Sequence, residues 1–486
     1  MYRQDHVILH PRFGFCGQMS VPVGAGCCGL GGTTVATGAA PTRTVPFLTR
    51  LTKHHRIPVN ALEEASVQAG GELVRLHMGP FRPYLVTHPD HVQHVLTQNQ
   101  TNFVREGMFW DPLAPLLGEG ILSDGETWAE SRRILQPLFT ARYVNSLAEQ
   151  MAVIINELIE ETIVPGRPMD ISRGVSAIVH PTIVRLFFGS KISTADIARL
   201  VPAYDVAVTA KAVRLVMPFV PEGMPMPGDR AFRRAIKDID AVVYPRIREA
   251  RARAREGLDQ DSTDVVARLV SAREDVPGEE GDRRIRDDLV AMHGASTETS
   301  ATALTWVWPV LDAYPGIAAK VYEEIDRVVG GDPVSTSHLP HMPYLRMFVN
   351  ELLRLYPPGW ILPRKAVEAD VVGGVEVEAG ATMLLSPYLT HRMPDFWESP
   401  TVFDPERFAP GWEAGRHRYA YWPFGAGPHV CLGQHLFQME APLLIAGILR
   451  KYRPVVHVDR PVTPRLASSL RPPPGLTMTL VPAGRS

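Results

Sequence analysis

One cysteine near the end of the chain lies in a segment suited to present a thiolate to a metal ion. Cys431 falls in the stretch Phe424-Gly425-Ala426-Gly427-Pro428-His429-Val430-Cys431-Leu432-Gly433, whose glycines let the backbone pass close to a flat ligand. An apolar helix is predicted to begin near Leu432, and its first N–H groups would point at the sulfur and lower the thiol pKa. A single soft ligand without zinc-like spacing favours an axial ligand of heme iron. The alternative is a buried cysteine in a tight turn.

A second candidate is an acid beside an alcohol in a long apolar helix. The segment reads Ala295-Ser296-Thr297-Glu298-Thr299-Ser300. Cleaving bound oxygen in a dry site requires protons, and an alcohol backed by a carboxylate is a suitable relay. Thr299 would then contact the oxygen, and Glu298 would connect it to solvent. The alternative is that Thr299 only bonds the carbonyl oxygen four residues back in its helix.

Several motifs in a fixed order relate these residues to a known family. Each is weak alone, but in this order, from about Ala61 to the C-terminus, they resemble the cytochrome P-450 monooxygenases. The motifs are Trp128-Ala129-Glu130-Ser131-Arg132, the Glu298-Thr299 helix, Glu351-Leu352-Leu353-Arg354, Pro405-Glu406-Arg407-Phe408 and the cysteine loop.

The resemblance implies a mainly α fold with small β-sheets, in one large helix-rich domain that encloses heme b (iron protoporphyrin IX). Cys431 would be the axial iron ligand, and Thr299 and Glu298 would be catalytic. Positions that match cofactor contacts of the family, several of them propionate contacts, are Trp128, Arg132, Arg364, His429, Phe424, Gly425 and Gly433. Burying the two heme propionates requires such cations and donors.

Three positions depart from the family pattern. Ser296 replaces a usual glycine, and Phe437 replaces a usual small residue. His429 stands where arginine is commoner, and histidine is neutral part of the time at pH 7 and cannot form a bidentate fork.

A charge triad is expected to hold the fold around the cysteine loop. Glu351 and Arg354 are three residues apart and share one helix face. Arg407 can complete the hydrogen bonds of the carboxylate. This role is structural.

The substrate-contacting segments follow from the resemblance and are mostly apolar or aromatic. Such a lining suits a hydrophobic small molecule such as a terpene or polyketide, although each residue could equally belong to the core. The predicted contacts are Phe109, Trp110, Met292, Ala295, Ser296, Gly359, Trp360, Ile361 and Ser468.

Composition describes an ordinary globular chain. Its 486 residues are 45% hydrophobic and 21% charged, and the net charge of −2 gives no reason to expect a nucleic-acid partner. Since no apolar run reaches membrane-spanning length, we expect no membrane anchor and a cytoplasmic location. Residues 1–45 are predicted to be a disordered, Gly-rich extension, and residues 46–486 the monooxygenase domain.

Periodicity places the main elements. A β-hairpin is predicted over Gly71–Thr87, and short strands over Lys365–Val377 and Val455–Val481. Helices are predicted over Pro89–Thr97, Glu126–Phe139, Val144–Ile163, Val175–Phe188, Arg230–Arg255, Arg283–Ala313 and Tyr344–Tyr356.

The sequence therefore predicts a monooxygenase that inserts one atom of O2 into a C–H or C=C bond. Electrons would come from ferredoxin and ferredoxin reductase, or from flavodoxin, because no flavin module is apparent. Arg133, Arg416, His417 and Arg418 are candidate docking cations. Alternatives are a heme-thiolate enzyme that uses peroxide or catalyses a rearrangement, and a heme-based sensor or binding protein.

Overall fold

A computed structural model describes residues 42–484, except 56–57, 108, 189–191, 211–219, 221–222, 259–264 and 459–460. Residues 1–41 of the predicted N-terminal extension therefore lie outside the described residues. Residues 43–45, at the end of that predicted extension, form a strand in the main sheet.

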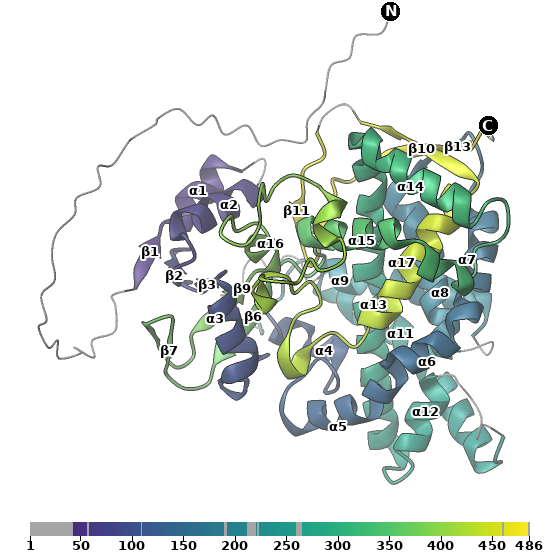
Figure 1. The fold of residues 1–486 in the computed structure, drawn as a ribbon. Coiled ribbons are helices and arrows are strands. Elements are labelled where there is room, and N and C mark those ends of the chain that lie inside the picture. Colours follow the sequence, from purple (N-terminus) through teal and green to yellow (C-terminus); the bar gives the residue numbers. More distant parts are fainter. Residues whose placement is uncertain are drawn as a thin grey trace, which may run out of the picture.

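Helices build the larger part of the molecule, and a sheet with α1 to α3 lies beside them (Figure 1). The mainly α prediction is confirmed. The α-helices are α1 (Phe47–Lys53), α2 (Pro58–Ala69), α3 (Pro89–Gln93), α4 (Ala114–Leu117), α5 (Gly125–Leu135), α6 (Ala141–Ser146), α7 (Ala148–Thr162), α8 (Ile171–Phe188), α9 (Thr194–Ala210), α11 (Asp229–Arg255), α12 (Val265–Ala272), α13 (Gly278–Ala313), α14 (Pro315–Val328), α15 (Pro343–Leu355), α16 (Pro387–Thr390) and α17 (Gln434–Leu449).

The largest sheet has six strands in the order β1-β2-β3-β9-β6-β4. Its antiparallel β2–β3 pair, with Val74 opposite Leu85, confirms the predicted hairpin. The strands are β1 (Arg43–Val45), β2 (Val74–Leu76), β3 (Tyr84–Val86), β9 (Thr382–Leu385), β6 (Leu362–Ala366) and β4 (Phe103–Val104). Arg364 is carried into the interior by β6.

Three smaller sheets complete the strands. β10 (Tyr452–His457), β13 (Thr477–Pro482) and β5 (Pro168–Asp170) form one sheet. The others are two-stranded, β7 (Asp370–Val372) with β8 (Val375–Val377), and β11 (Arg465–Leu466) with β12 (Leu470–Arg471). The β11–β12 hairpin is short, and its turn contains Ser468.

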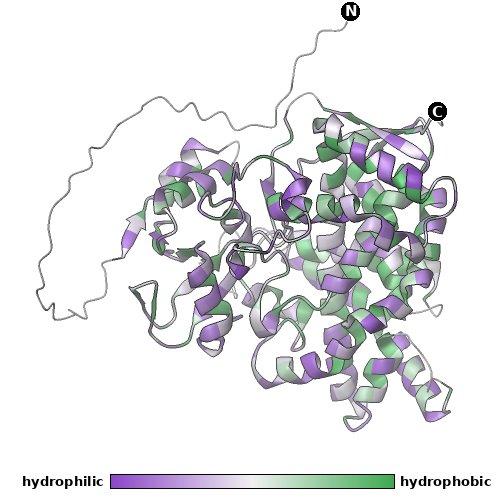
Figure 2. Ribbon diagram, viewed as in Figure 1, coloured by the Kyte–Doolittle hydropathy of each residue, from purple (hydrophilic) through white to green (hydrophobic). Residues whose placement is uncertain are grey.

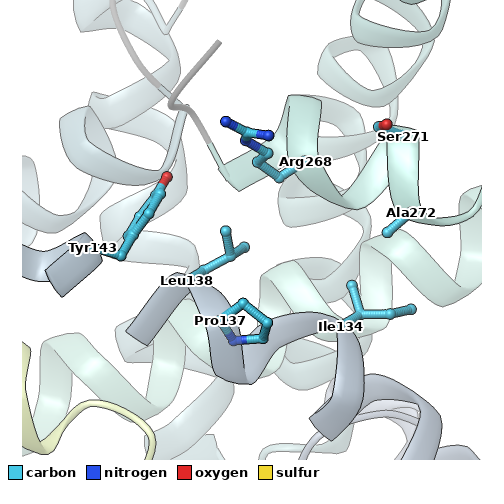
Figure 3. Close-up of a pocket in the computed structure, with 7 residues that line it drawn as sticks. All are labelled: Ile134, Pro137, Leu138, Tyr143, Arg268, Ser271 and Ala272. Carbon is cyan, nitrogen blue, oxygen red and sulfur yellow. The ribbon is translucent and has the colours of Figure 1, made fainter. Parts of the chain in front are cut away.

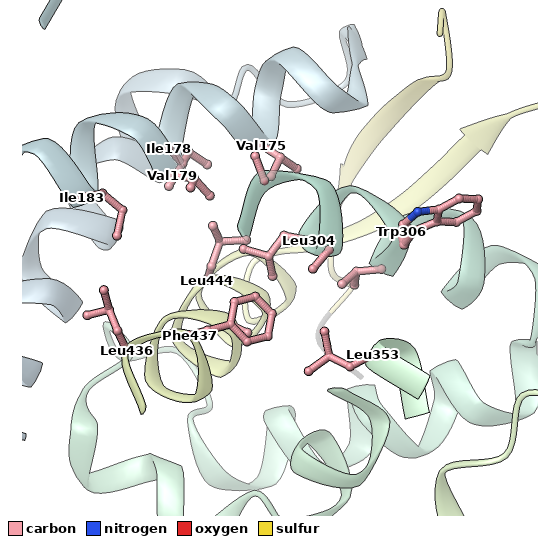
Figure 4. Packing of buried hydrophobic residues seen from close by; sticks show 14 of the residues in the cluster. Val175, Ile178, Val179, Ile183, Leu304, Trp306, Leu353, Leu436, Phe437 and Leu444 are labelled. Atoms are coloured by element: carbon pink, nitrogen blue, oxygen red, sulfur yellow. The ribbon is translucent and has the colours of Figure 1, made fainter. Parts of the chain in front are cut away.

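The hydrophobic core lies where α8, α13, α15 and α17 meet (Figures 2 and 4). The second half of α13 is buried on every side, as expected of a helix that runs through a core. Phe437, the departure from the family pattern on α17, is buried in this core near Leu304 and Leu353 (Figure 4). Its ring therefore fills space between helices.

Several predicted boundaries shift. The helix predicted over Val144–Ile163 is two helices, α6 and α7, separated at Leu147. The helix predicted from Pro89 ends in a π turn, His94–Gln98. The helix after the cysteine begins at Gln434, two residues later than expected. Within the described ranges, no helix has the length and apolar character needed to cross a bilayer.

Candidate cofactor and substrate site

The cysteine loop is shaped by glycines whose conformations other residues rarely adopt. Gly425 has φ +73° and Gly427 has φ +69°. A Cβ atom at Gly427 would lie 1.8 Å from the Leu96 carbonyl oxygen. The Cys431 N–H donates to the Phe424 carbonyl oxygen at 2.8 Å, which closes the loop just before α17. The local sequence thus fixes where the sulfur points.

The thiol has accessible surface although it is surrounded by protein. Burial raises the pKa of Cys431, while the backbone N–H groups of Gly433 and Gln434 and the cations Arg132 and Arg105 lower it in part. The net pKa shift is upward, so the sequence-based expectation of a lowered pKa is wrong for the protein without a bound metal. Desolvation outweighs the N–H groups. The same donors and cations would stabilise a thiolate bound to iron.

Buried Arg364 and half-buried Arg105 form no salt bridge with a carboxylate among the described residues, although the charge of Asp124 attracts both. Arg364 is 4% exposed and donates to its neighbour, the Pro363 carbonyl oxygen, at 2.7 Å. Burial lowers the pKa of Arg364 to about 10. Burial, and then repulsion by Arg364, lowers the pKa of Arg105 to about 9. Buried cations that repel each other indicate a place for an anionic group.

A buried indole N–H lies in the same region. Trp128 Nε1 is buried and has no hydrogen-bond partner among the described residues. The Trp128 ring stacks on the His429 ring, with centroids 4.0 Å apart. An unpaired buried donor beside unpaired cations is the arrangement that heme propionates would complete, so the residues present fit the group implied by the sequence.

His429 itself is engaged differently from the expectation. Its Nε2 lies 2.6 Å from Asp124 Oδ1, and Asp124 also accepts from the Arg105 backbone N–H. Burial lowers the pKa of His429, and Asp124 offsets part of this shift. His429 therefore binds a protein carboxylate in this structure rather than standing free for a propionate. Arg132 is also partly engaged, donating to the Val430 carbonyl oxygen at 2.7 Å.

Sequence reasoning missed Arg105 and Asp124. Arg105 follows β4, and Asp124 precedes the Trp128 helix α5. Neither occupies a motif that the sequence analysis used, and their importance comes from contact with His429 and Arg364, more than 230 residues away. The one available signal was an acidic residue just before a helix, which is usually only a cap.

Two candidate residues on α13, Ala295 and Thr299, are four residues apart and lie on the same face of the helix. Ala295 and Thr299 are exposed, whereas Thr297 and Ser300 behind them are buried. The Thr299 hydroxyl donates to the Ala295 carbonyl oxygen at 2.5 Å, the back-bond of the alternative interpretation. Ser296 donates in the same way to Met292 at 2.7 Å. Both hydroxyls retain lone pairs that can accept a further hydrogen bond.

Glu298 is tied to the β11–β12 hairpin. Its Oε1 accepts from Ser468 at 2.6 Å, from Ser469 at 2.9 Å and from Arg471 at 2.9 Å. The expected connection of Glu298 to solvent stays a prediction, since its side chain is 20% exposed and only its Oε1 is held by the hairpin. Glu298 and the predicted substrate residue Ser468 are brought together directly.

The remaining predicted substrate residues come from separate elements. Phe109 packs near Phe81, with ring centroids 5.9 Å apart. Trp110 donates to the Pro363 carbonyl oxygen at 3.2 Å, and Trp360 to the Ala467 carbonyl oxygen at 2.8 Å. The others are Met292, which is buried, and Gly359 and Ile361, which are half-buried.

The charge triad is formed as expected. Arg354 donates to both oxygens of Glu351, at 2.6 and 2.8 Å, and both side chains are fully buried. Arg407 Nε lies 3.5 Å from Glu351 Oε1. Arg354 also donates to the His391 carbonyl oxygen at 2.8 Å, so the triad fastens α15 to the segments that precede the cysteine loop.

Two of the four candidate docking cations, Arg416 and His417, form contacts within the protein. The Arg416 guanidinium lies over the Trp397 ring at 4.0 Å, and it donates to the Trp412 carbonyl oxygen. His417 lies 3.0 Å from Asp90. Arg133 and Arg418 are exposed. Arg416 therefore stabilises its own segment.

A groove elsewhere on the described surface lies between α5, α6 and α12 (Figure 3). None of the predicted site residues lines it. Its lining is Ile134, Pro137, Leu138, Tyr143, Arg268, Ser271 and Ala272.

Comparisons with known proteins agree with this geometry. The profile of the family described as Cytochrome P450 matches residues 41–480. The chain is 33% identical to the cyclooctat-9-en-7-ol 5-monooxygenase of Streptomyces melanosporofaciens, over 91% of each chain. It is 27% identical to the pentalenene oxygenase of Streptomyces avermitilis, over 92% of this chain and 98% of the relative. The crystal structure of a cytochrome P450DA heme domain matches with a TM-score of 0.79 at 23% identity, over 92% of this chain and 98% of that one.

Proposed function

Since the chain belongs to the cytochrome P450 family, we propose that it is a heme-thiolate monooxygenase that oxidises a hydrophobic terpenoid with O2. One atom of O2 enters a C–H or C=C bond of the substrate, and the other leaves as water with two electrons and two protons. The observation that carries the proposal is the accessible Cys431 in the same region as the unpaired Trp128 N–H and the cations Arg364 and Arg105, which form no salt bridge among the described residues.

The proposed cofactor is heme b. When bound, it would supply an iron centre that activates O2. Cys431 would hold the iron, and the N–H groups of Gly433 and Gln434 would stabilise the thiolate charge. Phe424 and Gly425 shape the loop. Arg364, Arg105 and Trp128 would hold the propionates, with Arg132 at the rim.

Side chains on α13 would deliver the protons that the reaction consumes. The Thr299 hydroxyl could move a proton by accepting a hydrogen bond with a lone pair and donating its own proton, after giving up its back-bond to Ala295. Glu298, one residue away, can deliver a proton and regain it from solvent. Ser296 provides a second hydroxyl on the same helix. A peroxide-using or rearranging enzyme, or a heme sensor, would need no such acid beside an alcohol.

The proposed substrate wall is formed by residues predicted to contact the substrate. They are Phe109, Trp110, Met292, Ala295, Gly359, Trp360, Ile361 and Ser468. Its chemistry is mainly apolar and aromatic, which suits a hydrophobic ring system with few polar groups. Two relatives are named for cyclooctat-9-en-7-ol and pentalenene, which supports a cyclic terpenoid over a polyketide.

The proposed electron source is a ferredoxin with its reductase, or a flavodoxin, and the proposed location is the cytoplasm. Exposed Arg133 and Arg418 are the cations that an acidic partner would meet. Residues 46–486 are proposed to be the monooxygenase domain, together with the strand residues 43–45.

The proposal is tested by turnover of a cyclic terpenoid panel with 18O2, NADPH and a surrogate ferredoxin system. We expect one 18O atom in the product. Thr299→Ala should keep heme content but release more hydrogen peroxide, with product per NADPH about tenfold lower, because proton delivery is worth at least this much.

Cys431→Ser is the control for the ligand. The ferrous wild type under carbon monoxide should show the red-shifted Soret band of a thiolate ligand, and Cys431→Ser should lack it. A band that persists in this variant would refute the ligand assignment. Turnover sustained by peroxide but never by NADPH and O2 would favour the peroxide-using alternative.

A further inference from the structure

The β11–β12 hairpin places three donors on a single carboxylate oxygen. Ser468, Ser469 and Arg471 all donate to Glu298 Oε1, at 2.6 to 2.9 Å. Among the described residues, none donates to Glu298 Oε2. One oxygen is therefore held while the other is left to interact with solvent or with a neighbouring hydroxyl. The side chain of Glu298 is 20% exposed, so the contacts lie close to the interior.

The donors are themselves held in place. Ser469 is 2% exposed, and its hydroxyl lies 3.1 Å from Thr302 Oγ1, one turn beyond Glu298 on α13. Arg471 Nε donates to the Ser469 hydroxyl at 3.3 Å. The backbone of Leu470 is fixed on both sides, donating to Pro358 at 3.0 Å and accepting from Trp306 Nε1 at 2.8 Å. These hydrogen bonds hold the β11–β12 hairpin in a fixed position against α13.

Arg471 is the ion-pair partner of Glu298 among the described residues. The other titratable group in electrostatic range is His180 on α8, whose pKa is lowered mainly by burial, so its neutral form is favoured near pH 7. Asp205 on α9 faces His180 as well. The cation that orients the Glu298 carboxylate therefore comes from the C-terminal hairpin and not from the helices packed behind α13.

We propose that Arg471 is a positioning residue that holds Glu298 in the orientation needed to supply protons to Thr299. This inference rests on the proposed relay of Glu298 and Thr299. A planar guanidinium donating to one carboxylate oxygen and to the adjacent serine restricts the rotamers of Glu298. Because Ser468 is itself a proposed substrate contact and donates to Glu298, the same hairpin would link the substrate wall to the acid.

The test compares Arg471→Met, Arg471→Lys and a matched control, Arg465→Met. Arg465 is exposed on the same hairpin, in β11, where it pairs with Arg471 across the two strands. Arg471→Met should lower product per NADPH about threefold, the loss expected for a partly exposed charge-assisted hydrogen bond, and should leave substrate affinity unchanged. Arg471→Lys should restore most of the coupling. Arg465→Met should behave as wild type.

A second readout does not depend on turnover. The rate of hydrogen exchange at the backbone amides of residues 466–471 reports how strongly the contacts with Glu298 stabilise the hairpin. Glu298→Gln and Arg471→Met should both speed this exchange, because each removes the same contact. Arg465→Met should not.

The outcomes separate the two proposals. If Glu298→Gln leaves product per NADPH unchanged, the relay in the proposed function is wrong. If Glu298→Gln uncouples turnover but Arg471→Met does not, the positioning role of Arg471 is wrong while the relay stands. Faster hairpin exchange in Arg471→Met without any change in coupling would likewise overturn the positioning role.

Discussion

His293 is a buried imidazole on α13. It is 1% exposed, and neither ring nitrogen has a hydrogen-bond partner among the described residues. Its ring lies 4.2 Å from the Tyr204 ring and 6.4 Å from the His180 ring, measured between centroids. Burial, and then His180, lowers the pKa of His293 to about 3. The folded protein therefore keeps this residue neutral.

This residue should make folding stability sensitive to acid. The unfolded chain binds a proton at His293 below its ordinary pKa of 6.5, whereas the folded protein does not until about pH 3. The stabilisation is complete well above pH 6.5 and falls as pH drops, by about 2 kcal/mol between neutral pH and pH 5. His293→Leu should remove this part of the pH dependence, measured by denaturant unfolding at several pH values.

The exposed His341 supplies the control, since His341→Gln should keep the wild-type pH dependence. The buried histidines His180 and His391, whose pKa values are also lowered, contribute in the same direction and remain in both variants. An equal acid sensitivity in His293→Leu and wild type would contradict the prediction.

The first half of α13 fixes the loop that leads into α5. Asp288 is fully buried and accepts from the Ile121 N–H at 2.9 Å, from Ser131 at 2.9 Å and from Arg273 at 2.6 Å. A Cβ atom at Gly120 would lie 2.5 Å from Asp288 Oδ1. One carboxylate thus joins α13, α5 and the loop before it, and so positions Trp128 and Arg132.

Asp288→Asn should destabilise the protein strongly. The substitution removes the 2.6 Å ion pair of the buried Arg273, which is 1% exposed, and leaves it only a 3.9 Å contact with Glu130, at a cost of about 3–5 kcal/mol. The free energy of unfolding measures the loss. Glu280→Gln, which breaks the exposed pair with Arg284 on the same helix, should change stability by about 0.5 kcal/mol or less. Similar losses of stability in the two variants would show that the buried contacts of Asp288 do not stabilise the fold.

At the scale of the whole molecule, β1 is the first described element of the fold, and we expect the N-terminal boundary there. Val45 is fully buried, and the strand pairs in parallel with β2. A chain that starts at residue 42 should keep the thermal midpoint of the full protein. A chain that starts at residue 47 should lose the Val45 contact, about 1.5–3 kcal/mol, and the β1 hydrogen bonds, with a clearly lower midpoint. A lower midpoint already on removal of residues 1–41 would place the boundary earlier.

Features that depend on near neighbours along the chain are predictable from the amino-acid sequence. The cysteine loop is predictable because Gly425 and Gly427 take conformations that glycine favours, close to the sulfur they position. The Glu351–Arg354 pair is predictable because residues three apart share a helix face. The long helix α13 and the β2–β3 hairpin are likewise predictable, because each has a regular short-range pattern of apolar residues.

Contacts between groups far apart along the chain are not predictable from local patterns and become visible in the folded protein. Glu298 and Arg471 are 173 residues apart, and Arg105 and His429 are 324 apart, so no local pattern joins them. The upward pKa shift of Cys431 and the capture of His429 by Asp124 also depend on burial and packing. Spacing along the chain sets backbone geometry over a few residues, whereas desolvation and ion pairing are set by whatever the folded chain places nearby.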